Sequence, residues 1–218
     1  MEKLRILVVD DHDVVRRGLR SLVETQVGWE VCGEATTGRE AVEKARSLRP
    51  NVVVMDITLP ELNGLEATRR IRKAVPQTQV FIVTVHESEE LLAQALRAGA
   101  HGCMVKSDAG HDLVRGIEAL AQGKPFFTSS VASILLGPHM GPAGRTPGAD
   151  FPGPQLSSRE REVIQLLAEA KSNKQVATLL NLSLKTVQTH RANIMRKLNL
   201  HSLGELIHYA LRNGIIAW

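Results

Sequence analysis

The sequence of 218 residues contains only two cysteines, and aromatic residues make up 3% of it. Two cysteines exclude a disulfide-rich scaffold and a Cys-rich zinc site, and they favour a reducing compartment. No apolar run approaches the ~18 residues that a membrane-spanning helix needs. The N-terminus lacks the long apolar core and the cleavage site of a secretory signal. We therefore expect a cytoplasmic protein without a membrane partner.

The charge is nearly balanced overall but unevenly distributed along the chain. Residues 1–136 carry 17 basic and 18 acidic side chains, whereas residues 155–218 carry 9 basic and 4 acidic ones. Apolar residues at 43% and charged residues at 23% are ordinary for a folded protein and exclude wholesale disorder. The basic C-terminal part indicates a polyanion such as DNA as partner, although many basic surfaces are merely solvated.

Glycine and proline gather in one segment, residues 137–154, where five of each occupy eighteen positions. This composition supports neither helix nor sheet and is typical of a linker. We expect a domain at 1–125, a linker at 126–155 with a short helix near 128–136, and a smaller domain at 156–218. The chain is long enough for both domains to bury a core.

Short apolar runs alternate with amphipathic stretches in the first domain. The runs lie at 6–9, 52–55, 80–83 and 103–105, with a weaker one at 31–32. Runs that are apolar throughout and rich in Val and Ile fit strands covered on both faces. Helical patterns fill the intervals, roughly at 14–24, 38–48, 64–74, 89–98 and 112–122. The alternation predicts an α/β domain with a doubly wound, five-stranded parallel sheet.

Polar side chains follow four of these runs. Asp10 and Asp11 follow the run at 6–9, and Asp56 follows the run at 52–55. Thr84 follows the run at 80–83, and Lys106 follows the run at 103–105. The carboxyl ends of parallel strands meet at one edge of the sheet, so these groups should converge. Three close carboxylates require a cation, and an all-oxygen donor set suits Mg²⁺.

Asp56 is the best nucleophile candidate, because it follows the central strand and leaves Asp10 and Asp11 to hold the metal. A carboxylate beside Mg²⁺ that faces a lysine and a hydroxyl is placed to attack a phosphoryl group. The alternative is that each acid merely caps the next helix, which stays open for any one of them alone. Five matched strand-end positions favour the common pocket.

These motifs resemble the CheY-like receiver domain of two-component response regulators over residues 4 to about 122. The matching segments are 6–11, 55–60, Asn63-Gly64, Thr84, and the stretch that begins with Ala98-Gly99-Ala100 and ends at Lys106. The resemblance implies that Asp56 accepts a phosphoryl group from a sensor histidine kinase. It also implies that Mg²⁺ is held by Asp10, Asp11, Asp56 and the backbone carbonyl of Thr58, and that Thr84 and Lys106 contact the phosphoryl group.

Three positions depart from the receiver pattern. Cys103 stands where the family has an aromatic side chain that helps to switch the domain, Val85 where it has a very small residue, and Ser107 where it often has proline. The first departure leaves the usual signal relay without its ring.

The second domain shows only helical periods. A capping-box pattern precedes the first helix, with Ser157 or Ser158 as the cap, and further helices are expected at 173–180, 184–198 and 203–213. They predict a small all-α domain. A short turn joins two of these helices, which is the helix-turn-helix arrangement whose second helix enters the major groove.

The outer face of 184–198 carries side chains suited to DNA, although a solvated polar face is the alternative. Gln188 suits an adenine edge and Thr189 a thymine methyl group, whereas Lys174, His190 and Arg196 suit phosphates. The full set of expected DNA contacts is Lys174, Lys185, Thr186, Gln188, Thr189, His190, Arg191, Ala192 and Arg196.

This part resembles the LuxR-type DNA-binding domain over about 156–216. The matching segments are 156–163, 172–174, 176–177, 182–183, 186–190 and 197–198. The resemblance implies a recognition helix near 184–198 and a last helix that often forms a dimer contact. Ala170, Gln188 and Leu203 depart from the usual Gly, Lys and Arg, and Ala170 is expected to strain a helix end.

The two resemblances together indicate a response regulator of the NarL/FixJ type, and not an enzyme. Phosphorylation of Asp56 would then control dimerisation and DNA binding. One alternative is an aspartate phosphohydrolase, but Thr58 occupies the position where that class has a second Asp. Another is a regulator that no longer responds to phosphorylation.

Overall fold

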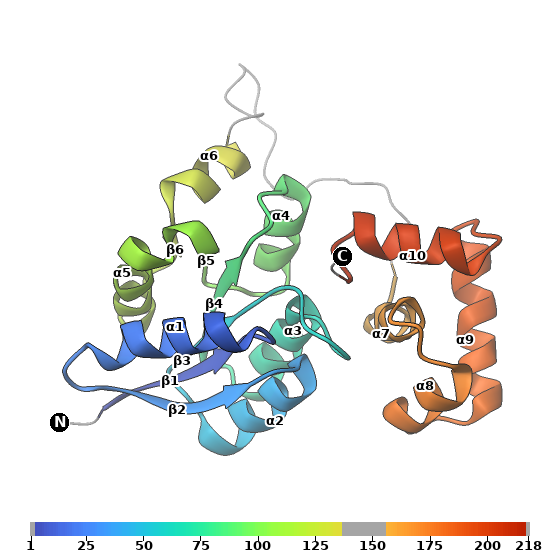
Figure 1. Ribbon diagram of the computed structural model, residues 1–218, viewed down its shortest axis with the longest axis horizontal. Coiled ribbons are helices and arrows are strands. Elements are labelled where there is room, and N and C mark those ends of the chain that lie inside the picture. Colours follow the sequence, from blue (N-terminus) through green and yellow to red (C-terminus); the bar gives the residue numbers. More distant parts are fainter. Residues whose placement is uncertain (1–2, 137–155, 217–218) are drawn as a thin grey trace.

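The computed structural model describes residues 3–136 and 156–216. They form an N-terminal α/β unit and a C-terminal helical unit, coloured blue to yellow and orange to red in Figure 1. The Gly/Pro-rich part of the expected linker, from residue 137 to 155, lies outside the described residues. Within the described residues, no helix has the length and apolar character needed to cross a membrane.

The α/β unit is built on one parallel sheet with the strand order β2-β1-β3-β4-β5-β6. Its strands are β1 (Leu4–Val9), β2 (Trp29–Ala35), β3 (Val52–Met55), β4 (Gln79–Thr84), β5 (Gly102–Val105) and β6 (Phe126–Phe127). The predicted doubly wound parallel sheet is confirmed. The sixth strand was not predicted, because two residues are too few to give a periodic pattern.

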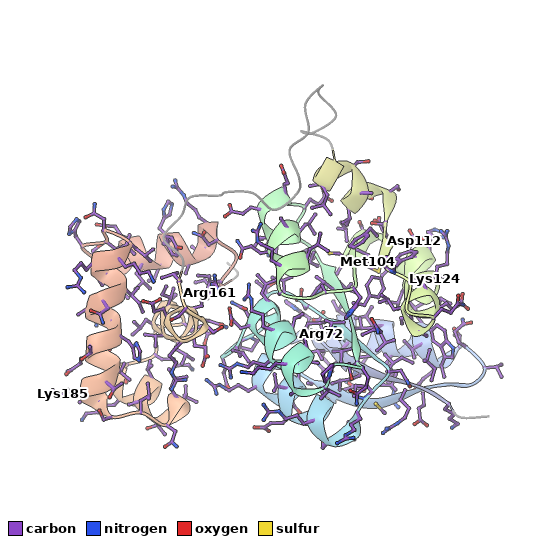
Figure 2. The ribbon with its side chains drawn as sticks, turned by 180° about the vertical axis from the view of Figure 1, so that it is seen from behind. Arg72, Met104, Asp112, Lys124, Arg161 and Lys185 are labelled. Carbon is purple, nitrogen blue, oxygen red and sulfur yellow. The ribbon has the colours of Figure 1, made fainter. Side chains whose placement is uncertain are left out.

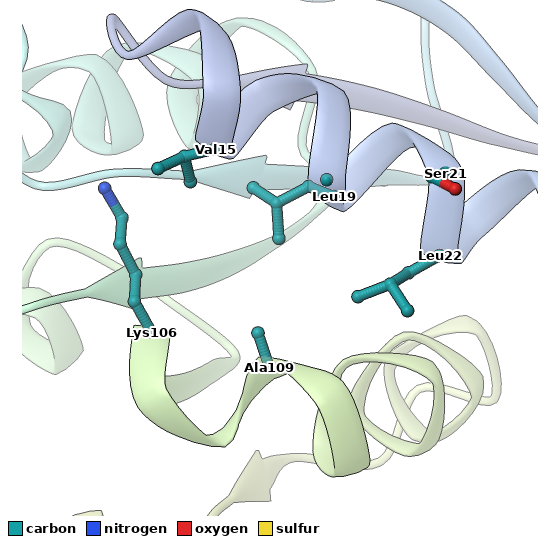
Figure 3. Close-up of a pocket in the computed structure, with 7 residues that line it drawn as sticks. Val15, Leu19, Ser21, Leu22, Lys106 and Ala109 are labelled. Atoms are coloured by element: carbon teal, nitrogen blue, oxygen red, sulfur yellow. The ribbon is translucent and has the colours of Figure 1, made fainter.

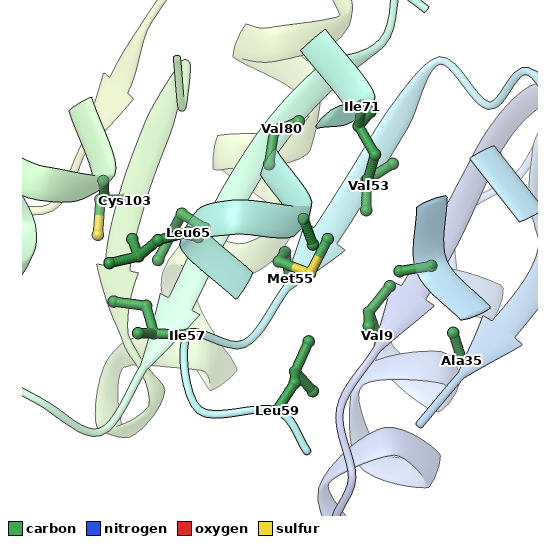
Figure 4. Packing of buried hydrophobic residues seen from close by; sticks show 14 of the residues in the cluster. Val9, Ala35, Val53, Met55, Ile57, Leu59, Leu65, Ile71, Val80 and Cys103 are labelled. Carbon is green, nitrogen blue, oxygen red and sulfur yellow. The ribbon is translucent and has the colours of Figure 1, made fainter. Parts of the chain in front are cut away.

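Helices cover both faces of the sheet. They are α1 (Asp13–Glu24), α2 (Gly38–Leu48), α3 (Gly64–Ala74), α4 (Glu89–Arg97), α5 (Ala109–Ala121) and α6 (Ser129–Leu136). Helices α1 and α5 pack on one face, against side chains such as Val54 and Phe81. Helices α2, α3, α4 and α6 pack on the other face, where Val53 and Met55 point (Figure 4).

Burial on both faces explains why the central strands are apolar at every position. All four residues of β3 and all four of β5 are buried, and β1 is buried from Ile6 onward. Helix α5 begins three residues before the expected start, since the 3₁₀ turn Lys106–Asp108 leads into it directly.

The C-terminal unit consists of α7 (Ser158–Ala168), α8 (Asn173–Leu180), α9 (Leu184–Lys197) and α10 (Leu203–Arg212). Ser157 rather than Ser158 caps α7, through a complete capping box with Glu160. Ala170 follows α7 with φ of 60°, so the predicted strained position at this helix end is confirmed.

Candidate functional site

The side chains predicted to converge do lie together at the carboxyl edge of the sheet. Asp10 and Asp11 follow β1, Asp56 follows β3, Thr84 ends β4 and Lys106 follows β5. The ligand atoms of Asp10, Asp11, Asp56 and the neighbouring His12 all lie within 4.8 Å of one another. The three carboxylates of this set offer the oxygen ligands that a hard cation such as Mg²⁺ prefers.

Lys106 joins two of the carboxylates. Its Nζ lies 2.7 Å from Oδ2 of Asp10 and 2.9 Å from Oδ2 of Asp56. Burial alone would lower the pKa of Lys106, but the charges of Asp56 and Asp10 outweigh burial and raise the pKa above 10.5. Burial is also the main reason that the pKa of Asp56 is raised, against the lowering effect of Lys106 and with a further raising effect of Asp10.

The Lys106 stem also lines a pocket of about 380 Å³ between α1 and α5 (Figure 3). Its other walls include Val15, Leu19, Leu22 and Ala109. The ammonium lies at one end of these apolar groups, so the aliphatic stem packs among hydrocarbon while the charge stays with the carboxylates.

The segment after Asp56 is held tightly against the sheet. The Ile57 backbone N–H donates to Oδ1 of Asp56 at 2.7 Å, and the Gly64 N–H donates to the Ile57 carbonyl at 2.7 Å. A Cβ atom on Gly64 would lie 1.9 Å from the Asp56 carbonyl oxygen, so only glycine allows α3 to begin here. Thr58 is part of this closed loop and is partly exposed.

Thr84 and Cys103 occupy the switch positions implied by the resemblance. Thr84 is buried, and its Oγ1 accepts a hydrogen bond from the His86 backbone N–H at 3.1 Å. Cys103 is fully buried in the core formed with Val131 of α6, and Ile134 packs against the same cluster. Burial raises the pKa of the Cys103 thiol to about 12. The position that an aromatic ring would occupy is therefore filled by a small buried thiol.

The helix-turn-helix expected in the C-terminal unit is formed by α8 and α9. Ser172 caps α8 through a capping box and Ser183 caps α9, while Asn181 adopts the left-handed conformation between them. Val187 and Ile194 of α9 are buried in the helical core.

The outer side of α9 is open to solvent. Six of the nine expected DNA contacts are exposed, namely Lys174, Lys185, Gln188, Thr189, Ala192 and Arg196, whereas Thr186, His190 and Arg191 are partly buried. The Thr186 hydroxyl lies 2.8 Å from that of Ser183, and the Thr189 hydroxyl donates to the Lys185 carbonyl. In Figure 2, Lys185 projects from the end of the molecule distant from the α/β unit.

Two features were not predicted. His12 lies at the acidic cluster, with Nδ1 2.9 Å from Oδ1 of Asp11. Polar side chains of α7, above all Gln165, contact the loop that follows Asp56. The proximity of His12 to Asp11 in the sequence could have indicated the first, but no pattern in α7 indicates the second.

Comparisons with known proteins agree with both parts of the structure. Residues 6–118 match the family of response regulator receiver domains, and residues 154–210 match the luxR family of bacterial regulatory proteins. The chain is 34% identical to the transcriptional regulatory protein MctR of Rhizobium johnstonii over 99% of this chain and 96% of that protein. It is also 34% identical to the response regulator UvrY of Escherichia coli K12, over 97% and 95% of the two chains.

A solved structure of the response regulator RcsB in complex with DNA is similar with a TM-score of 0.60 and 25% identity, covering 97% of this chain and 99% of that one. The family defined by these two domain matches consists of DNA-binding transcription regulators and not of enzymes. The chain therefore belongs to the two-component response regulators that join a receiver domain to a LuxR-type DNA-binding domain.

Proposed function

We propose that Asp56 is the phosphoryl acceptor of this response regulator and that its phosphorylation controls dimerisation and DNA binding. The observation that carries the proposal is the contact of Lys106 with both Asp56 and Asp10, at a sheet edge that also presents Asp11 and Thr84. A lone helix-capping aspartate would not need a partly buried ammonium and two neighbouring carboxylates.

Asp10, Asp11, Asp56 and the Thr58 carbonyl would hold Mg²⁺, which when bound neutralises charge on the phosphoryl oxygens. A carboxylate oxygen of Asp56 attacks phosphorus, so an O–P bond forms as the N–P bond of a phosphohistidine breaks. The electron pair of that bond stays on the departing imidazole nitrogen. Lys106 and Thr84 bind the transferred oxygens.

The phosphohistidine donor is supplied by a sensor histidine kinase, which is the partner that receiver domains imply. Sustained hydrolysis of phosphate esters is not expected. Thr58 stands where phosphohydrolases place a second aspartate as general acid, and a threonine hydroxyl is too weak an acid for that role.

DNA is the proposed target of α9. Lys185, Gln188 and Arg196 are exposed on one helix of a helix-turn-helix, and the similar RcsB structure was solved with DNA. Two such domains in a homodimer would place their recognition helices about one duplex turn apart. A chromosomal target implies that the protein works in the cytoplasm.

We propose the division of the chain into a receiver domain at 1–125, a linker at 126–155 and a DNA-binding domain at 156–218. The described receiver elements extend through α5 at Ala121, and α7 begins at Ser158. Helix α6 belongs to the linker by this division but packs on the receiver core through Val131.

The function is tested by footprinting on genomic DNA fragments, with and without acetyl phosphate and Mg²⁺, at fixed salt. We expect the phosphoryl donor to tighten protection for the wild-type protein and to have no effect on Asp56→Asn. Equal protection in all four conditions would instead favour a regulator that does not respond to phosphorylation.

Substitutions in α9 separate specific contacts from general attraction. Lys185→Ala should weaken binding to all fragments and lower the slope of affinity against salt by about one unit. Gln188→Ala should instead change the preferred sequence, at a cost of about 1–3 kcal/mol on the native site. No effect from either change would argue against α9 as the recognition helix.

A further inference from the structure

Gln165 of α7 makes two hydrogen bonds to the receiver domain. Its side chain is 1% exposed. The Oε1 atom accepts from the Asn63 backbone N–H at 2.8 Å, and Nε2 donates to the Leu59 carbonyl at 2.7 Å. A primary amide satisfies a donor and an acceptor of the receiver loop at once, which a glutamate of the same shape could not do.

Glu169, the residue that caps the C-terminus of α7, adds a third bond to the same loop. Its Oε1 accepts from the Glu61 backbone N–H at 3.0 Å and from Nε2 of Gln165 at 2.8 Å. Two side chains of the DNA-binding domain thus bind three backbone groups between Leu59 and Asn63. We call this set of contacts the α7 clasp.

Ion pairs strengthen the docking of α7 on α3, which face each other in Figure 1. Glu66 of α3 is 1% exposed and lies 3.1 Å from Arg161 of α7, while Glu162 of α7 is 2% exposed and pairs with Arg70 of α3. Buried carboxylates are costly unless they are paired, so removing this docking would leave both groups to be solvated.

The clasped loop is the one that follows Asp56. It is closed at its base by the bond between Gly64 and Ile57, and it contains Thr58. Glu61 at its tip has φ of 65°, a conformation that a residue with a Cβ atom rarely adopts and that persists only when surrounding contacts hold it. The clasp supplies such a contact directly at the Glu61 backbone N–H.

Two observations bear on how this loop couples the domains. Residue 103, where the receiver family has an aromatic side chain that helps to switch the domain, is a buried cysteine here, so this position has no ring to report on the pocket. Lys185, Gln188 and Arg196 remain exposed while α7 is docked, so docking does not act by covering the recognition helix.

We propose that the α7 clasp is a latch that holds the Leu59–Asn63 loop in its unphosphorylated conformation and thereby opposes phosphoryl acceptance at Asp56. Reaction at Asp56 shifts Thr58 and the adjoining loop, breaks the bonds to Gln165 and Glu169, and frees the DNA-binding domain to pair with a second copy. Because coupling between sites is reciprocal, loosening the latch must favour phosphorylation. The proposal rests on Asp56 being the acceptor.

The test uses the full-length protein with Gln165→Ala, which removes two bonds to the loop, and Glu169→Ala, which removes one. Gln175→Ala is the matched control, because it breaks the capping box of α8 in the same domain without touching the receiver. We expect Gln165→Ala to be phosphorylated by acetyl phosphate roughly five-fold faster or more, Glu169→Ala to change in the same direction by less, and Gln175→Ala to match wild type.

Amide hydrogen exchange gives a second measurement that does not depend on phosphorylation rate. The Glu61 and Asn63 amides should exchange faster in Gln165→Ala than in wild type, and faster in wild type after addition of Mg²⁺ and beryllofluoride as a phosphoryl mimic. The Gly64 amide, bonded within the receiver to Ile57, should change much less.

The outcomes separate the latch from the proposed function. If wild type gains no phosphoryl group, the proposed function itself fails. If wild type is phosphorylated but Gln165→Ala reacts at the same rate or more slowly, or if the mimic leaves exchange at Glu61 and Asn63 unchanged, the latch is wrong and the acceptor role stands. If Gln165→Ala does not fold, Glu169→Ala decides by the same criteria.

Discussion

Lys106 and Asp56 form an ion pair of 2.9 Å in the acidic pocket, and the same ammonium reaches Asp10 at 2.7 Å. Two buried carboxylates and one partly buried ammonium leave the pocket with excess negative charge. That excess explains how one site can hold a lysine and still attract a divalent cation.

Replacing Lys106 by methionine should make the protein depend on Mg²⁺ for stability. Without the ammonium, Asp10 and Asp56 repel each other, and we expect a loss on the order of 2–3 kcal/mol in metal-free buffer. Mg²⁺ should then bind about ten-fold more tightly, because a nearby positive charge has been removed. Thermal unfolding with and without Mg²⁺ checks both points.

Lys124→Met is the control for this experiment, since Lys124 is exposed near the end of α5. It should unfold like wild type at every Mg²⁺ concentration. A Lys106→Met protein that gains no more from Mg²⁺ than the control would contradict the charge balance described for the pocket.

Gly64 is predicted to be irreplaceable even by alanine. The added methyl group would meet the backbone of Asp56 and Ile57, which cannot move without shifting the strand. We expect Gly64→Ala to lower the free energy of unfolding by about 3 kcal/mol. Gly18→Ala in α1 has open space around the new methyl group and should gain up to about 1 kcal/mol from helix propensity. Urea denaturation measures both changes in the free energy of unfolding. Similar changes for Gly64→Ala and Gly18→Ala would contradict the close approach of Gly64 to the Asp56 backbone.

The Cys103 thiol should not react in the folded protein. Burial raises its pKa to about 12, and it lies in the same buried cluster as Val131 of α6, a helix that packs on β5. In a Cys32→Ser background, iodoacetamide at mildly alkaline pH should label Cys103 only after denaturation. Val131→Ala should speed labelling by loosening this cluster. Rapid labelling of the folded parent protein would mean that α6 does not close this part of the core.

His101 should make the receiver less stable in mild acid. Its Nδ1 accepts a hydrogen bond from the Val80 N–H at 3.1 Å, which requires the neutral ring. Burial, followed by the charge of Arg72, lowers its pKa below 6.5. The unfolded chain therefore binds the proton more readily, so the stability from this group is complete above 6.5 and decreases as pH falls from there to the folded-state pKa.

Urea midpoints measured through this pH range check the effect. His101→Gln, whose amide oxygen can accept the same bond, should lose less stability than wild type on acidification. His111→Gln, at an exposed position in α5, should follow wild type. If wild type and His101→Gln lose the same stability as the pH falls, His101 is not the cause of the acid sensitivity.

The pocket was predictable because parallel strands end at a common edge, so Asp10, Asp56 and Lys106 could be placed together from strand order alone. The helix-turn-helix was predictable because two helical periods, at 173–180 and 184–198, are separated by only a short turn. Beyond these features the sequence carried less information.

The contacts between the domains could not be predicted. Glu66, Glu162 and Gln165 lie on amphipathic helices where charged and amide side chains normally face solvent. Their burial results from the docking of one domain on the other, and the helical period of a sequence contains no information about such docking. Likewise, the sequence placed a short helix near 128–136 but did not show that Val131 would be buried in the same cluster as Cys103.

The central claim is that Asp56 accepts a phosphoryl group in a pocket completed by Mg²⁺. Intact-mass spectrometry of the full-length protein after incubation with acetyl phosphate tests it most directly. The account predicts that wild type gains the mass of one phosphoryl group only when Mg²⁺ is present, and that Asp56→Asn gains none. A wild-type protein that stays unmodified, or an equal gain in Asp56→Asn, would contradict it.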